Sequence, residues 1–198
     1  DIIRNFNYKF LKDKIYVFQG QNGAGKTTLI NILIGLIQED VTGFVEYNNI
    51  NCYDLDMYWI RKNKISVVRQ DYSFSNDTVL SILSDNNGIN IEQIDGFLKN
   101  VQWENLFISR KFDYRDYLQK HINELSGGEQ QKIALLKAII KQSDVLILDE
   151  PTSAMDQESI NIFKEAVKKY SKDRIIILVS HNRTIIDIAD EIVNFYRE

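Results

Sequence analysis

Short runs of β-branched and aromatic residues recur along the chain, and helix-like stretches separate them. Such runs, when about four to eight residues long, are typical of β-strands. Strands that alternate with helices indicate an α/β fold with a mostly parallel sheet. The run Val-Leu-Ile-Leu at 145–148 has no polar position, which is typical of a strand buried on both faces. The expected strands lie at 15–19, 64–68, 145–149, 174–180 and 192–196.

The pattern changes after residue 70, where short helix-like stretches alternate with polar turns as far as residue 124. The clearest helix is expected at 90–101, and the clearest turn is Asp-Asn-Asn-Gly at 85–88. A further helix is expected at about 126–141. This part of the chain is therefore expected to form a helical subdomain inserted into the α/β core.

The whole chain is expected to be one domain, with its core at about 1–70 and 142–198 and the helical subdomain at about 71–141. A hairpin is expected at 42–51, forming a small antiparallel sheet beside the parallel one. The expected fold class is thus α/β, with a mostly parallel core sheet, an antiparallel side sheet and a helical insert.

The composition fits one compact unit, because 198 residues with 44% hydrophobic content can bury a single substantial core. The net charge of -4 gives no overall attraction to nucleic acid, so no nucleic-acid partner is expected. Cys52 is the single cysteine and cannot form an intramolecular disulfide, which favours a reducing compartment. The longest apolar runs fall far short of the ~20 residues of a membrane helix, so any membrane-spanning part is expected outside this chain.

A glycine-rich segment follows the first expected strand. Residues 20–27 read Gly-Gln-Asn-Gly-Ala-Gly-Lys-Thr, which fits the phosphate-loop pattern G-x-x-x-x-G-K-[ST]. The segment stands between an apolar strand and an apolar helix expected at 29–37, as this pattern requires. Glycines let successive N–H groups turn toward phosphate oxygens, and the helix N-terminus adds the positive end of its dipole. Lys26 would supply a charge to the β and γ phosphates, and Thr27 a hydroxyl ligand to Mg²⁺.

Two carboxylates, Asp149 and Glu150, stand where the apolar strand at 145–149 leaves the sheet. Ligands gather at this place in open α/β folds. Acidic residues there also commonly cap the segment that follows, so the pair alone leaves both interpretations open. The presence of a phosphate loop in the same chain favours a functional site.

The run Leu-Ser-Gly-Gly-Glu at 125–129 lies between these two motifs in the sequence. Two glycines at a helix start expose N–H groups, and Ser126 adds a hydroxyl, so this run can bind an anion. The order of the three motifs resembles that of the ATP-binding cassette (ABC) ATPases, and the resemblance covers almost the whole chain.

The resemblance implies ATP and Mg²⁺ as cofactors and gives roles to several residues. Asp149 resembles the Walker B aspartate that holds Mg²⁺, and Glu150 matches the family's general base. Gln70 resembles the Q-loop glutamine, which contacts Mg²⁺ and the attacking water, and His181 matches the switch histidine that contacts the γ phosphate. Residues 153–156, Ser-Ala-Met-Asp, resemble the D-loop.

The expected site therefore has three groups of residues. The catalytic residues are Glu150, His181 and Gln70, and the Mg²⁺ ligands are Thr27, Gln70 and Asp149. The nucleotide contacts are Gly20, Asn22, Gly23, Ala24, Gly25, Lys26, Thr27, Thr28, Ser126, Gly127, Gly128 and Asp156.

In this family the 125–129 run completes the ATP site of the opposite subunit. A chain that carries both halves of such a site implies a head-to-tail dimer with two ATPs at the interface. The implied partners are a second nucleotide-binding domain, identical or different, and a transmembrane domain, fused or separate. The implied location is the cytoplasmic face of the cell membrane.

Some segments favour a subtype and others depart from it. Residues 59–70, Phe74 and 78–82 resemble exporter-type cassettes, whereas 119–124 lack the glycine-containing acidic motif common in exporters. The family's adenine-stacking aromatic residue and first strand would fall upstream of Asp1, so no residue is assigned to adenine.

The leading hypothesis is an ATPase that powers transmembrane transport, in the direction of export. A soluble ABC-type ATPase acting on ribosomes or DNA is the alternative, although tandem cassettes or long insertions are usual there. A regulatory cassette that binds ATP without turnover is disfavoured by the presence of both Glu150 and His181.

Overall fold

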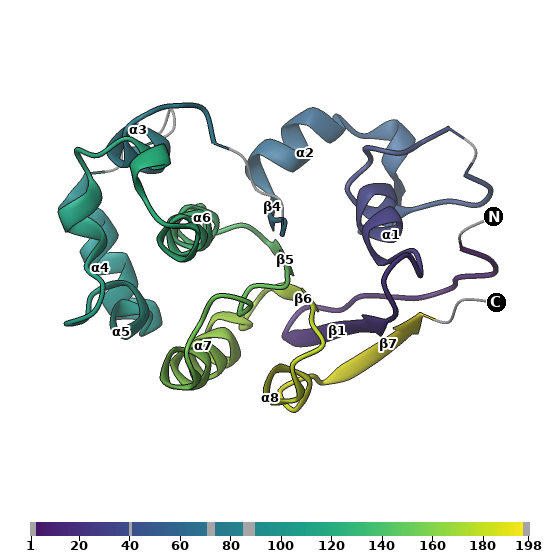
Figure 1. The fold of residues 1–198 in the computed structure, drawn as a ribbon. Coiled ribbons are helices and arrows are strands. Elements are labelled where there is room, and N and C mark those ends of the chain that lie inside the picture. Colours follow the sequence, from purple (N-terminus) through teal and green to yellow (C-terminus); the bar gives the residue numbers. More distant parts are fainter. Residues whose placement is uncertain (1–2, 40, 71–73, 85–89, 196–198) are drawn as a thin grey trace.

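The computed structural model describes residues 3–39, 41–70, 74–84 and 90–195. Its main sheet has five parallel strands in the order β4-β5-β6-β1-β7 (Figure 1). This confirms the predicted α/β class with a parallel sheet. The strands are β1 (Lys14–Gly20), β4 (Ile65–Val68), β5 (Val145–Asp149), β6 (Ile175–Val179) and β7 (Glu191–Phe195). The polar turn predicted at 85–88, and residue 196 at the end of the last predicted strand, lie outside the described residues.

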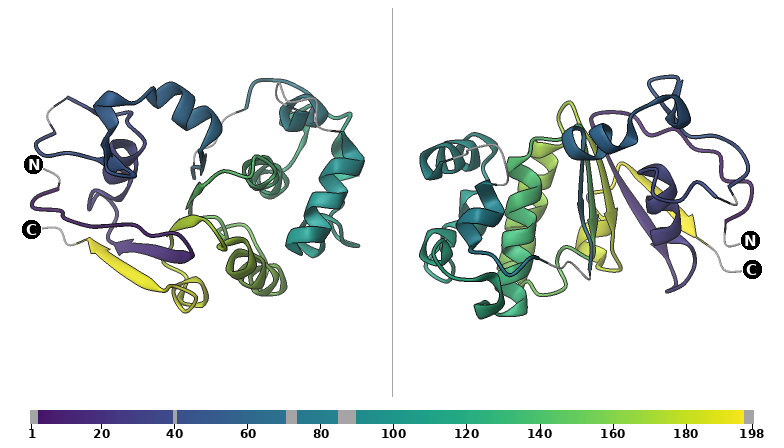
Figure 2. Two further views of the ribbon diagram at one scale, coloured as in Figure 1. Left: turned by 180° about the vertical axis from the view of Figure 1, so that it is seen from behind. Right: turned by 90° about the horizontal axis from the view of Figure 1, so that it is seen from above.

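Helices cover both faces of this sheet. Helix α1 lies on one face, and α6 and α7 lie on the other, with α3, α4 and α5 beyond them (Figures 1 and 2). The α-helices are α1 (Lys26–Leu33), α2 (Met57–Asn63), α3 (Val79–Ser84), α4 (Ile91–Val101), α5 (Glu104–Phe107), α6 (Gly127–Ile140), α7 (Gln157–Tyr170) and α8 (Arg183–Ile186). Short 3₁₀ turns occur at Cys52–Asp54, Tyr114–Tyr117 and Ile122–Glu124.

The two faces of the sheet belong to two apolar clusters, because successive side chains of a strand point to opposite sides. Val17 and Leu146 pack in the larger cluster with the helices from α3 to α7. Phe18 and Ile147 pack in the smaller cluster with α1. Trp103, at the start of α5, is fully buried in the larger cluster. The aromatic residues Trp103, Phe107, Phe112 and Tyr114 of the helical segment are all buried and form part of this core.

Helix α1 is shorter than predicted. A helix expected to reach residue 37 ends at Leu33. Gly35 has a left-handed φ of +67°, a conformation that ends helices. The guanidinium of Arg61 donates to the carbonyl oxygens of Ile34 and Gly35 at 3.1 and 3.2 Å, which satisfies acceptors at this helix end.

The predicted hairpin is confirmed, with a shorter ladder than 42–51. Strands β2 (Glu46–Tyr47) and β3 (Ile50–Asn51) pair antiparallel. Asn48 and Asn49 between them both have positive φ, at 51° and 64°. Two such residues form the kind of turn that suits the twist of a hairpin.

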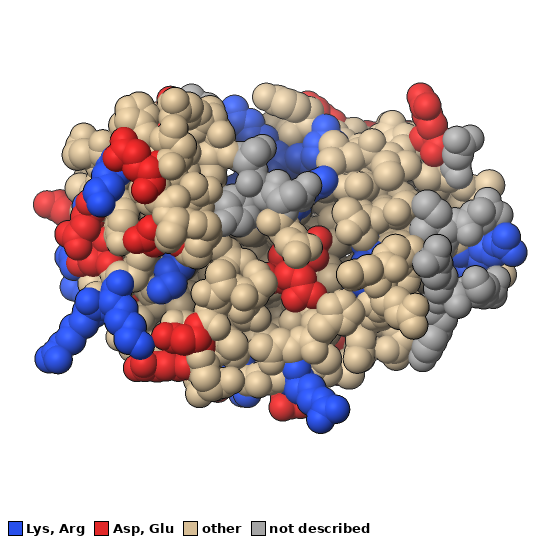
Figure 3. All heavy atoms as spheres, in the orientation of Figure 1, with Lys and Arg blue, Asp and Glu red and all other residues tan. Residues whose placement is uncertain are grey.

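The surface carries both signs of charge. Figure 3 shows Lys and Arg side chains interspersed with Asp and Glu over one face of the molecule. In the described ranges, no helix combines the length and the apolar composition needed to span a membrane.

Candidate functional site

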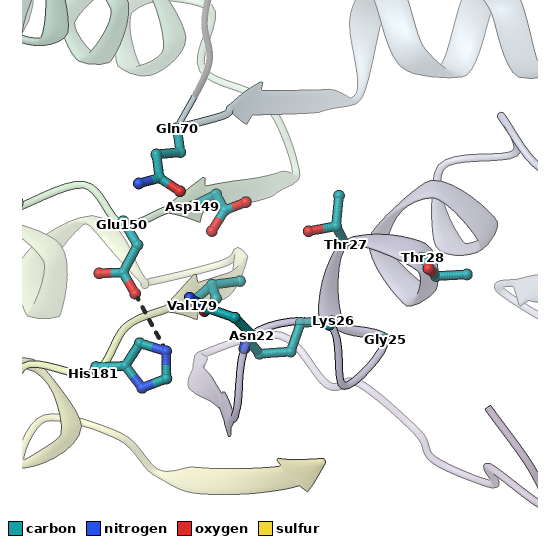
Figure 4. A pocket seen from close by; sticks show the side chains of 11 residues that line it. Asn22, Gly25, Lys26, Thr27, Thr28, Gln70, Asp149, Glu150, Val179 and His181 are labelled. Carbon is teal, nitrogen blue, oxygen red and sulfur yellow. Dashed lines mark ion pairs between the residues drawn. The ribbon is translucent and has the colours of Figure 1, made fainter. Parts of the chain in front are cut away.

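One cleft opens where the parallel strands end, the usual ligand position in open α/β folds. It has a volume of about 370 Å³ (Figure 4). It brings together residues from the phosphate loop, from the ends of β4, β5 and β6, and from the segment after β6. They are Asn22, Gly23, Gly25, Lys26, Thr27, Thr28, Gln70, Asp149, Glu150, Val179 and His181.

The phosphate loop joins β1 to α1 and closes around a lysine. Gly25 stands at the N-cap of α1 with φ +96° and supplies no side-chain cap, so N–H groups of the first turn remain available to a ligand. Lys26 is buried, and its ammonium donates to the carbonyl oxygens of Gly20 and Gln21 at 2.6 and 2.9 Å. A cation and the positive end of a helix dipole thus face the same cleft, an arrangement suited to phosphate.

Gly20 and Gly23 are needed in this loop for different structural reasons. Gly20 has φ +156°, and a Cβ on it would lie 2.4 Å from the carbonyl oxygen of Phe195 on β7. A Cβ on Gly23 would meet nothing within 4 Å, but Gly23 has φ +78°, which other residues rarely adopt. Gly20 is therefore needed for close packing against β7, and Gly23 for the backbone conformation of the loop. Neither Gly20 nor Ala24 lines the cleft itself.

The predicted acid and histidine lie together at the cleft. His181 Nε2 is 3.8 Å from Glu150 Oε1 (Figure 4). Burial raises the pKa of Glu150, nearby His181 lowers it, and neighbouring Asp149 raises it, with a net upward shift. A half-buried carboxylate with a raised pKa is a stronger proton acceptor than an ordinary surface glutamate.

The predicted Mg²⁺ ligands also meet in the cleft. Figure 4 shows the side chains of Gln70 and Asp149 on one side and the Thr27 hydroxyl directed toward them from α1. Among the described residues, no group of three or more His, Cys, Asp or Glu could hold a metal ion. One carboxylate, one hydroxyl and one amide oxygen fit Mg²⁺ held mainly by water and substrate phosphates.

The 125–129 run does not line this cleft. Ser126 is exposed just before α6, and both its N–H and its hydroxyl donate to Oε2 of Glu129, at 2.8 and 2.7 Å. The other oxygen of Glu129 accepts from the hydroxyl of Tyr117 at 2.5 Å. Gly127 and Gly128 form the first turn of α6. This anion-binding candidate is therefore separate from the cleft of its own chain.

Asp156 likewise lies outside the cleft, at the N-cap of α7. Its carboxylate accepts from the N–H of Ser159 at 2.8 Å and from Lys111 at 3.2 Å. These contacts, the Ser159 bonds foremost, hold the pKa of Asp156 at about 2. The segment before it contacts the 125–129 run, because a Cβ on Gly128 would lie 3.6 Å from that of Ala154.

Sequence reasoning missed three residues around the site. Val179 lines the cleft from β6, Lys111 holds Asp156, and Gln131 reaches the backbone of Glu150 from α6. The sequence pattern could have identified Gln131 as a residue with a buried polar partner. It occupies the same helical face as Ala134, Leu135 and Ala138, so a polar side chain is expected there only if it has a buried partner.

Comparisons with known proteins agree on one family. The family model described as "ABC transporter" matches residues 3–153. An ATP-dependent lipid A-core flippase of Pasteurella multocida (strain Pm70) is 30% identical over 193 residues, covering 96% of this chain and 33% of the flippase. Multidrug resistance protein pgp-1 of Caenorhabditis elegans is 29% identical over 194 residues, covering 98% of this chain and 14% of that protein. The chain thus spans a third or less of these relatives.

Two solved structures share the fold. A bacterial Atm1-family ABC exporter with ATP bound has a TM-score of 0.82 at 20% identity, over 98% of this chain and 34% of that one. A dimeric bacterial ABC transporter cassette has a TM-score of 0.76 at 23% identity, over 98% and 86% of the two chains.

Proposed function

This chain belongs to the ABC transporter family, and we propose that it hydrolyses ATP to power export of a substrate across a membrane. One observation carries the proposal. A single cleft joins a phosphate loop to a half-buried carboxylate, and a histidine stands 3.8 Å from that carboxylate. Phosphoryl transfer to water needs this combination of a phosphate cradle and a positioned proton acceptor.

Each cleft residue has a part in this chemistry. Lys26 would exchange its bonds to Gly20 and Gln21 for contacts with the β and γ phosphates. Thr27, Asp149 and Gln70 would hold Mg²⁺, which neutralises charge on the phosphate oxygens when bound. Glu150 would take a proton from the attacking water, and His181 would contact the γ phosphate. Fixed groups of this kind lower the barrier chiefly by positioning and charge stabilisation.

The position of the 125–129 run supports assembly into a head-to-tail dimer. Ser126, Gly127 and Gly128 do not line their own cleft, so a nucleotide they bind would be that of a second cassette. A two-fold axis would then place one nucleotide in each of two shared sites. One of the structures with this fold is a dimeric cassette.

We also propose a transmembrane partner, fused or separate, with the cassette on the cytoplasmic face of the membrane. The relatives named for lipid A-core flipping and multidrug resistance support export as the direction. Co-sedimentation of the cassette-bearing protein with membranes would support this proposal. Co-sedimentation with ribosomes would favour the soluble alternative instead.

Replacing the base tests the chemistry directly. Glu150→Gln keeps size and polarity but cannot accept a proton, so it should bind MgATP normally and hydrolyse it about 100-fold or more slowly. Glu165→Gln removes an exposed carboxylate paired with Lys168 on α7 and should leave turnover unchanged. Wild-type turnover in Glu150→Gln would remove Glu150 as the base.

The pH dependence of ATP hydrolysis gives a second test. Because the pKa of Glu150 is raised, the wild-type rate should begin to fall at a higher pH than it would with an ordinary glutamate as the base.

A further inference from the structure

Gln131 is a buried polar residue on α6 that reaches across to the end of β5. Only 6% of it is exposed. Its Nε2 donates to the backbone carbonyl of Glu150 at 3.2 Å and to the hydroxyl of Ser153 at 3.0 Å. A buried amide of this kind is expected to have hydrogen-bond partners, and these two bonds join α6 to the turn that begins at Glu150.

The residue it contacts has an unusual backbone. Glu150 has φ +50°, a left-handed conformation that is rare for residues other than Gly, Asn and Asp. Its N–H donates to the carbonyl of Val179 at 2.9 Å, and its own carbonyl also accepts from the N–H of Ser153 at 3.3 Å. Such a conformation persists when surrounding bonds determine it. The direction of the Glu150 side chain depends on this backbone, so Gln131 contributes to where the carboxylate lies.

Gln131 also connects two parts of the proposed machinery. It lies on α6 one turn after Gly127 and Gly128, the glycines at the start of that helix. Gly128 itself packs beside Ala154, next to the Ser153 that Gln131 contacts. A displacement of the first turns of α6 would therefore shift the turn that begins at Glu150.

We propose that Gln131 is a positioning residue, which fixes the backbone of Glu150 and links it to the helix that begins at the 125–129 run. This inference rests on the proposed function, in which that run contacts the nucleotide of the partner cassette. A nucleotide bound by α6 in the shared site would then act, through Gln131, on the base that serves the other site. Gln131 touches no nucleotide in this scheme.

The test uses Gln131→Met in the protein that carries this domain. Methionine keeps the length and fills the buried space but donates no hydrogen bond. The expected result is a kcat about tenfold lower with KM for ATP and MgATP affinity unchanged, because misplacing a catalytic group affects the transition state rather than binding. A purely structural role would lower only the melting temperature.

A matched control and a second variant complete the test. Gln119→Met changes an exposed glutamine and should leave kcat unchanged. Ser153→Ala removes one partner of Gln131 at an exposed position, so it should fold even where Gln131→Met does not, with kcat reduced a few-fold. Wild-type kcat in folded Gln131→Met, or wild-type kcat in Ser153→Ala, would overturn the inference. An absence of ATP hydrolysis by the wild-type protein would instead overturn the proposed function.

Discussion

A single glycine shows how one residue type can satisfy a motif and a fold at once. Gly20 begins the phosphate-loop pattern, yet the contact that requires it is with β7, where a Cβ would lie 2.4 Å from the Phe195 carbonyl oxygen. Gly20→Ala should therefore lower the free energy of unfolding by at least about 2 kcal/mol, because the sheet must open to accept the methyl group. Urea unfolding without nucleotide measures this loss.

Gly23→Ala is the matched control in the same loop. A Cβ there meets nothing within 4 Å, so only the positive φ of +78° opposes it. That strain costs about 1 kcal/mol. Gly20 also has a positive φ, of +156°, so a larger loss in Gly20→Ala would measure the contact with β7. Equal losses in the two variants would show that backbone strain decides the need for Gly20.

At the same scale, the sequence predicted which side chains meet in the cleft but not how they are held. The phosphate-loop pattern and the resemblance to ABC ATPases predicted that Lys26, Gln70, Glu150 and His181 share one site, and all four line the same cleft. The left-handed backbone of Glu150 has no sequence signal, because glutamate shows no preference for it. The bond from Gln131 depends on how α6 packs against β5, which is a tertiary contact.

Among the elements, α7 begins with a residue whose charge stabilises it. Asp156 caps the helix, and its pKa is held at about 2, below its ordinary value of 3.8, foremost by the Ser159 bonds. A carboxyl with a lowered folded pKa stabilises the fold fully above its unfolded value and loses that contribution as pH falls through the folded one. Asp156→Asn, which can still cap, should lower the melting temperature at pH 6, and the gap should narrow below about pH 4.

Lys111, which forms an ion pair with Asp156, provides a control for this prediction. Lys111→Met removes an ion pair whose lysine is 73% exposed, so it should lower the melting temperature less than Asp156→Asn does. Added salt should shrink both effects. A melting-temperature gap for Asp156→Asn that stayed constant from pH 6 to pH 3 would contradict a role for the charge.

The sequence predicted the positions of helices and strands more accurately than it predicted their lengths. The strands and the helix at 91–101 lie where hydrophobic periodicity placed them. The end of α1 depended on Gly35 and on Arg61, which caps it from α2. The ladder of the hairpin was limited to two residue pairs. The Arg61 contact joins segments that are 26 and 27 residues apart in sequence, which a local pattern does not contain.

For the whole molecule, the separation of two anion-binding surfaces has a consequence for assembly. The phosphate loop faces the cleft, whereas Ser126 is exposed elsewhere and bonded to Glu129. If the two surfaces served one nucleotide within a chain, they would line one cavity. Their separation favours a nucleotide shared between two chains, with each chain supplying a different half.

Mixing two disabled chains tests this sharing. Lys26→Ala removes the phosphate-loop cation, and Ser126→Arg blocks the 125–129 run, so neither homodimer has a complete shared site. A mixed dimer has one complete site, formed by the intact loop of one chain and the intact run of the other.

The measurement is the number of ATP molecules occluded per dimer. Both variants also carry Glu150→Gln, so bound ATP is not hydrolysed and the result does not depend on turnover at the second site. We expect about one occluded ATP per mixed dimer and almost none in either homodimer. An absence of occlusion in the mixture, with two ATPs in the Glu150→Gln dimer, would instead place both surfaces at the same chain's nucleotide.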